Sequence, residues 1–167
     1  MNYLTLSRIL FIAMMINDSI VMIRSAPETR KNAPFPRFFP LSVLVLFVPI
    51  VFAINLPEWL AVIAVTGQVV GLGLEIVGEI QLARASSFSV SPLTPVEPQS
   101  SGLYRFLENP IYFGILLQFA AWALWMPLLF ITVALQYEAF RQGVSAERSE
   151  LARANFTLRR FDSVLWN

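Results

Sequence analysis

The chain contains neither cysteine nor histidine. Their absence excludes disulfides, thiol nucleophiles, zinc sites built from these residues, and any histidine acting as a general base or haem ligand. Charge is also scarce: Asp, Glu, Lys and Arg make up 14% of the 167 residues, against about 25% in a typical soluble domain. Any chemistry must therefore use carboxylates, tyrosine, arginine, asparagine, backbone groups or a reactive cofactor.

Apolar residues dominate instead. They make up 56% of the sequence, and the mean hydropathy is +0.63, which predicts an integral membrane protein. The net charge is only +1 and the basic residues are dispersed, so no nucleic-acid partner is expected. The first apolar run lacks a basic leader and a small-residue cleavage site, so we expect no cleavable signal peptide.

The apolar runs predict an all-α, polytopic bundle of about five membrane segments. The first covers residues 4–23, the second 39–57 with a kink at Pro49, and the third 58–83. Polar segments at 24–38 and 84–109 follow the first and third.

Residues 111–140 are mostly apolar but are interrupted at 125–127 by Trp-Met-Pro. A hairpin turning there would have arms of roughly 21 Å at 1.5 Å per residue, shorter than the ~30 Å hydrocarbon core. The arms would therefore be shallow or the bilayer locally thinned. A single long, kinked span is the alternative, and a charged helical tail follows at 141–167.

The basic residues favour the hairpin. Of the twelve Lys and Arg residues, four lie in 24–38, two in 84–109 and five in 141–160. A hairpin keeps all three regions on one side, and the positive-inside rule makes that side the cytoplasm. We therefore expect the N-terminus outside and the C-terminal helix in the cytoplasm.

The third segment carries a polar face. Gln68, Glu75 and Glu79 follow one another at steps of seven and four residues, so they share one side of the helix. They form either the wall of a ligand pocket or interhelical pairs, for example with Arg84. Asp18 in the first segment is either part of a functional site or a residue that pairs with another helix or lies near the interface. Gly67 and Gly71, four residues apart, predict a close helix–helix approach.

The stretch Gly102–Gly114 separates the second polar segment from the apolar hairpin. Its Asn109-Pro110 pair predicts a helix that begins at Pro110, because a residue before proline leaves helical geometry and proline is tolerated at the first helical position. The free N–H groups at such a helix start suit a carboxylate or hydroxyls of a polar ligand.

The same residues resemble a known family. Gly-Leu-Tyr-Arg at 102–105 and Asn-Pro-Ile-Tyr-Phe-Gly at 109–114 resemble the signature of membrane methyltransferases typified by isoprenylcysteine carboxyl methyltransferase. The Arg-Ala-Ser-Ser-Phe-Ser run at 84–89 and the acidic residues Glu147 and Glu150 stand where that family has similar elements. The resemblance covers roughly 67–161.

Departures from the signature keep other relatives open. Leu103 stands where the family has Pro, and Glu108-Asn109 replaces Arg-His. The acidic residue before Asn109, with a Gly-x-Gly at 71–73, resembles phosphatidylethanolamine N-methyltransferases, in which Glu138 would be an alternative acidic residue. NADPH-dependent sterol reductases share a similar Asn-Pro-x-Tyr element. Loss of Arg-His also leaves a non-catalytic scaffold as a rival class.

The resemblance implies an S-adenosylmethionine-dependent methyltransferase, with N-terminal membrane helices at 1–66 and a catalytic core at 67–167. The implied catalytic residues are Glu108, Asn109 and Tyr112. The implied cofactor-binding residues are Gly71, Gly73, Tyr104, Arg105, Asn109, Pro110, Tyr112, Gly114, Glu147 and Glu150. The favoured acceptor is a lipophilic carboxylate of the isoprenylcysteine type that enters from the bilayer, and no metal is expected.

Overall fold

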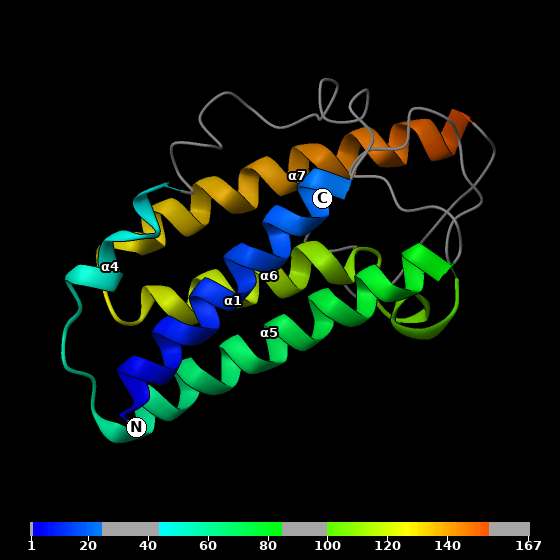
Figure 1. The fold of residues 1–167 in the computed structure, drawn as a ribbon. Coiled ribbons are helices and arrows are strands. Elements are labelled where there is room, and N and C mark those ends of the chain that lie inside the picture. Colours follow the sequence, from blue (N-terminus) through cyan, green and yellow to red (C-terminus); the bar gives the residue numbers. More distant parts are fainter. Residues whose placement is uncertain (1, 25–43, 85–99, 154–167) are drawn as a thin grey trace.

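A computed structural model describes residues 2–24, 44–84 and 100–153, and these form helices and no strand, as the predicted all-α class requires. The long helices lie side by side (Figure 1). The elements in chain order are α1 (Tyr3–Arg24), α4 (Val48–Val51), α5 (Glu58–Arg84), η1 (Gly102–Arg105), α6 (Pro110–Ala123), η2 (Pro127–Leu129) and α7 (Phe130–Arg153).

The first two long helices run in the same direction. The hydroxyl of Tyr3 donates to Glu58 at 3.4 Å near their starts, and the amide of Asn17 donates to Glu75 at 2.6 Å further along. Parallel neighbours require the chain to return between them, so the end of α1 and the start of α5 lie at opposite ends of the bundle (Figure 1).

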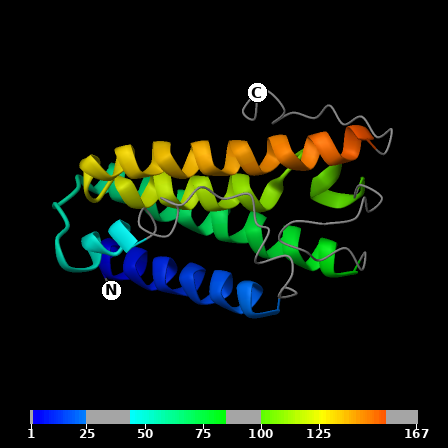
Figure 2. The ribbon, with the colours of Figure 1, turned by 90° about the horizontal axis from the view of Figure 1, so that it is seen from above.

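The two ends of the bundle differ in sequence. We call the end where α1, α5 and α7 finish, at Arg24, Arg84 and Arg153, the arginine end. The opposite end holds the turn between α6 and α7, and we call it the turn end (Figure 2). As predicted, the polar segments after the first and third apolar runs begin at the same end.

Helices α5 and α6 are antiparallel and pack closely against each other. A Cβ built on Gly67 would lie 2.9 Å from the Cβ of Ala121, and one on Gly71 would lie 2.6 Å from the carbonyl oxygen of Gly114. Only glycine permits this approach. The prediction of close packing at Gly67 and Gly71 is therefore confirmed.

The apolar stretch 111–140 forms a hairpin rather than one long helix. Helix α6 ends at Ala123, and after η2 the chain returns as α7, which lies alongside α6 (Figure 2). The predicted turn near Pro127 is confirmed. The predicted boundary at residue 141 is wrong, because α7 continues through it to Arg153 and joins the second arm to the start of the charged tail; the tail beyond Arg153 lies outside the described residues.

The predicted second membrane helix, 39–57, is wrong in its described part, 44–57. Residues 44 and 45 are helical, a turn at 46–47 interrupts the helix, and after the four-residue α4, residues 52–57 are not helical. The proline at position 57 disfavours helical geometry in the residue before it. The segment instead closes the turn end: the carbonyl of Leu46 accepts from Trp122 Nε1 at 2.7 Å, and Ile54 N–H donates to the carbonyl of Trp125 at 2.9 Å.

Among the described residues, two helices meet the length and composition required to cross a membrane. They do so over Tyr3–Ile20 in α1, which is 18 residues, and Glu58–Ala83 in α5, which is 26 residues; α6 is apolar but has only 14 residues. Both present large apolar side chains outward, as a membrane helix does toward lipid. These include Ile9, Ile12, Ile16, Ile20, Val62, Ile63, Val69, Val70, Ile76, Val77 and Ile80.

The predicted division of the chain at residues 66 and 67 falls inside α5, which is continuous there. The assignment of a catalytic core to 67–167 stays a prediction.

Candidate functional site

The Asn109-Pro110 pair forms the helix start that the sequence predicts. Asn109 is the N-cap of α6, and its side-chain Oδ1 accepts from the N–H of Tyr112 at 3.2 Å. Its carbonyl accepts from the N–H of Phe113 at 3.0 Å, which is the first helical hydrogen bond. Pro110 occupies the first position, where its missing N–H removes no helical hydrogen bond.

The stretch before this helix start is anchored to α5. Gly102 has a φ of 60°, in the left-handed region that favours glycine. A Cβ at Gly102 would also lie 2.6 Å from the side-chain oxygen of Gln81. The same oxygen accepts from the N–H of Leu103 at 3.0 Å. This anchor holds η1 against the end of α5, where the side chain of Tyr104 is buried.

An ion pair joins the stretch to α7. Arg148 Nε donates to Glu108 Oε1 at 2.6 Å, and a terminal nitrogen of Arg148 donates to Glu108 Oε2 at 2.7 Å. The Glu108 side chain is only 6% exposed and that of Arg148 is 27% exposed. Glu108 and Arg148, forty positions apart in the sequence, therefore form a bidentate, partly buried ion pair. Bidentate pairing is the strongest geometry for an arginine and a carboxylate.

Several predicted site residues come together at the arginine end. Tyr104, Asn109 and Pro110 lie within the anchored stretch, and the ring of Tyr112 stacks on Phe140 of α7 with centroids 4.7 Å apart. Glu147 and Glu150 lie on α7 on either side of Arg148 in sequence, and their side chains lie outside the description.

Gly71, Gly73 and Arg105, which were also predicted to bind the cofactor, have different surroundings. Gly71 faces Gly114, where both serve helix packing, whereas a Cβ on Gly73 would meet nothing within 4 Å, and Gly73 is exposed. The two glycines of the Gly-x-Gly therefore do not face a common surface. Arg105 is exposed, with its guanidinium 5.8 Å from the ring centroid of Phe106.

A second polar cluster lies inside the bundle between α1, α5 and α6. The carboxylate of Glu75, fully buried, accepts from Asn17 Nδ2 and from Gln118 Nε2, each at 2.6 Å. The same nitrogen of Asn17 lies 3.0 Å from both oxygens of Glu79. Asp18 also lies against Glu75. We call these five residues the buried carboxylate cluster.

The cluster confirms that Gln68, Glu75 and Glu79 share one face, since Gln68 hydrogen-bonds Ser7 of α1 along the same contact. The hydrogen-bond donors to the two carboxylates include the side-chain amides of Asn17 and Gln118, whereas the side chain of Arg84, the predicted partner, lies outside the described residues. In the described part of the chain no group of three or more acidic residues is placed to hold a metal ion.

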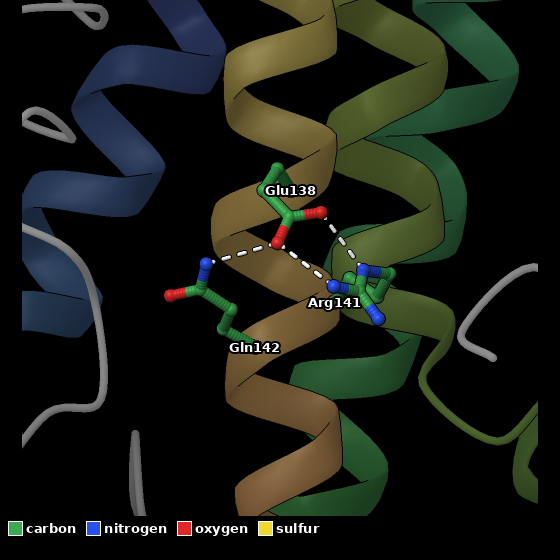
Figure 3. A network of polar contacts seen from close by, with 3 residues as sticks. All are labelled: Glu138, Arg141 and Gln142. Atoms are coloured by element: carbon green, nitrogen blue, oxygen red, sulfur yellow. Dashed lines mark hydrogen bonds and ion pairs between the residues drawn. The ribbon is translucent and has the colours of Figure 1, made fainter.

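Glu138, the alternative acidic residue, is engaged within its own helix. Its carboxylate accepts from Arg141 at 2.8 and 2.9 Å and from Gln142 at 2.9 Å (Figure 3). The Glu138 and Arg141 side chains are 39% and 37% exposed. The pair lies on the surface of α7, unlike the half-buried pair at Arg148.

The residues of these sites that were not predicted from the sequence include Gln81, Gln118 and Arg148. Gln118 had a usable signal, because it is the one strongly polar residue in the apolar helix α6 and follows Gly114 by one helical turn. No sequence signal marks Gln81 or Arg148, because each is an ordinary polar residue near a helix end and its partner comes from another element.

Helices α6 and α7 also border an open apolar groove of about 420 Å³. Its lining includes Phe113, Leu116 and Leu117 from α6 and Phe130, Val133 and Tyr137 from α7.

Comparison with known proteins found no matching family model, no matching curated protein and no matching solved structure.

Proposed function

We propose that this chain is an integral membrane S-adenosylmethionine-dependent methyltransferase that modifies a lipophilic acceptor. One observation carries the proposal. The capped start of α6, the buried Tyr104 and the part of α7 that holds Glu147 and Glu150 meet at the arginine end, joined by the Glu108–Arg148 ion pair. These are the two halves of the motif that resembles membrane methyltransferases.

The residues at this end fit the chemistry of the cofactor. The start of a helix carries partial positive charge and suits the carboxylate of the cofactor's amino acid. Carboxylates on α7 suit its ammonium group or ribose hydroxyls, which makes Glu147 and Glu150 the candidates. The side chains of Tyr104 and Tyr112 are buried, and the Tyr112 ring already stacks on Phe140, so they are not offered as a surface for its adenine.

The bound cofactor supplies an already activated methyl group on a sulfonium. The protein then needs mainly to align the acceptor and exclude water, which a chain without histidine or cysteine can do. Within this proposal, Asn109 and Tyr112 orient the reacting groups at the start of α6, and Glu108 holds the stretch in place.

A carboxylate acceptor of the isoprenylcysteine type suits the chain best. The carboxylate oxygen forms a bond to the methyl carbon, the carbon–sulfur bond breaks, and sulfur keeps the electron pair. No proton has to be removed, so no general base is required.

An amine acceptor of the phosphatidylethanolamine type is the second candidate, because its nitrogen must lose a proton and the bundle contains carboxylates that can take one. Glu75 and Glu79 are buried. They flank Gly78, whose Cβ would lie 2.9 Å from Ile111 near the start of α6. This approach of α5 to the start of α6 supports a role for Glu75 or Glu79 as the proton acceptor.

The topology that accompanies the proposal has the N-terminus outside and the C-terminus in the cytoplasm. Its support is the position of the helix ends: α1, α5 and α7 all finish in arginine at one end, as the positive-inside rule expects of a cytoplasmic face. A cytoplasmic site gives access to a water-soluble cofactor.

A methyl-transfer assay tests the function. The purified full-length chain is incubated with methyl-labelled S-adenosylmethionine and either a prenylated cysteine or phosphatidylethanolamine in detergent. We expect label in the prenylated cysteine that mild base releases as methanol, because esters hydrolyse. Base-stable label in phosphatidylethanolamine would support the amine candidate. No transfer to either acceptor, or to a total lipid extract, contradicts the proposal.

A further inference from the structure

The contact between Glu108 and Arg148 holds the stretch before α6 against the far end of α7. Both oxygens of the carboxylate are used, at 2.6 and 2.7 Å. The carboxylate side chain is almost entirely shielded, at 6% exposure. A paired, shielded charge is retained in one geometry, because separating it leaves an uncompensated charge in a poorly solvated position.

Glu108 is placed so that its contact with Arg148 acts on the start of α6. It directly precedes Asn109, whose side chain and carbonyl make the first two hydrogen bonds of α6. A displacement of Glu108 therefore moves the N-cap residue Asn109 and the backbone N–H groups in the first turn of α6. On the other side, Arg148 lies between Glu147 and Glu150 on α7.

We infer that Glu108 and Arg148 are a positioning pair that sets the distance between the start of α6 and the part of α7 that carries Glu147 and Glu150, and so sets the affinity for the cofactor. The inference rests on the proposed function for the cofactor, but the holding of the stretch does not depend on it. Neither residue is required to touch the cofactor. The only other described ion pair, Glu138–Arg141, lies within one helix and bridges no elements.

Which residue of the pair carries the negative charge also matters for the start of α6. Glu108 precedes the N-cap of α6, where the helix dipole favours a negative group. Exchanging the two charges keeps the attraction but places a cation at the positive helix end. The exchanged pair should therefore restore only part of what a single substitution loses.

The chain offers a matched control. Arg141 lies two helical turns before Arg148 on the same helix and also pairs with a glutamate. Arg141→Gln and Arg148→Gln make the same chemical change on α7, but only Arg148→Gln releases the stretch. The chain contains no cysteine, so single labels can be introduced without removing any native residue.

The experiment places spin labels at Phe106→Cys and Ser145→Cys, which are both exposed, and measures their distance distribution in the detergent-solubilised full chain. S-adenosylhomocysteine affinity is measured on the same variants by calorimetry. We expect Arg148→Gln to broaden the distribution and weaken affinity at least about tenfold. Arg141→Gln should do neither, and Glu108→Arg with Arg148→Glu should recover both in part.

The distance distribution and the affinity together distinguish failure of the holding contact from failure of the positioning role. An unchanged distance distribution in Arg148→Gln overturns the holding contact itself. A released stretch with unchanged affinity shows a purely structural contact and overturns the positioning role. If the native chain binds no S-adenosylhomocysteine, the proposed function and the positioning role fall together, while the distances still decide whether the pair holds the stretch.

Discussion

Gly71 of α5 and Gly114 of α6 face each other so closely that a Cβ added to either would lie 2.6 Å from the carbonyl oxygen of the other. The contact places the start of α6 against α5 and brings the side chain of Gln118, one turn later, onto Glu75. The two helices that carry the buried carboxylate cluster are therefore held together by backbone contact.

Gly114→Ala should destabilise the protein by about 1–3 kcal/mol, because the added methyl group meets backbone and not a movable side chain. Gly73→Ala is the matched control on α5. Its Cβ meets nothing within 4 Å, so it should be neutral or stabilising by about 0.5–1 kcal/mol through helix propensity. Denaturation in detergent followed by circular dichroism measures both. Equal effects of the two substitutions would contradict the close contact.

The amide of Gln118 donates to a fully buried carboxylate, so its removal should be costly. Gln118→Leu should destabilise by about 1–3 kcal/mol, because one oxygen of Glu75 loses its donor. The double variant Glu75→Leu with Gln118→Leu should be less destabilised than the single one, since both polar partners are then gone and Asn17 keeps Glu79. The same denaturation assay applies, and a double variant at least as destabilised as the single one refutes this explanation.

Asn109 has a capping role and a proposed binding role that substitutions can separate. Asn109→Ala should cost about 1 kcal/mol through loss of the N-cap, whereas Asn109→Asp retains an oxygen that accepts from Tyr112 and should preserve stability. If Asn109 also orients the cofactor, both variants should weaken S-adenosylhomocysteine binding. Binding that falls only in the alanine variant would assign Asn109 to capping alone.

The proposed topology makes the two ends of the bundle accessible from opposite sides. Phe106 lies at the arginine end and Leu128 at the turn end, and both are exposed. In oriented membranes, Phe106→Cys should react with an impermeant thiol reagent only from the cytoplasmic side and Leu128→Cys only from the outside. Labelling of both from one side would contradict a hairpin between α6 and α7 that enters the membrane.

The local features of this fold could be predicted because short-range rules decide them. Residues 4–23 and 58–83 are apolar over the length of a crossing helix, and α1 and α5 begin and end within one residue of these limits. Pro127 and the Asn109-Pro110 pair marked a turn and a helix start that both occur. In each case the residues that decide the conformation are neighbours in sequence.

Features that depend on contacts between distant residues were not predicted. Residues 39–57 are as apolar as a membrane helix, yet the described part packs over the turn end through Leu46 and Ile54, which bond to tryptophans of the hairpin. The partner of Glu108 is forty residues away, and that of Glu75 on α6 is forty-three away. Hydrophobicity and periodicity carry no information about such pairs.

Calorimetry of S-adenosylhomocysteine binding to the detergent-solubilised full chain tests the proposed function most directly, because it requires no knowledge of the acceptor. We expect saturable binding at one site per chain, weakened at least about tenfold by Glu147→Ala and unaffected by Arg141→Gln. Absence of saturable binding to the native chain would contradict the methyltransferase assignment and favour a non-catalytic membrane protein.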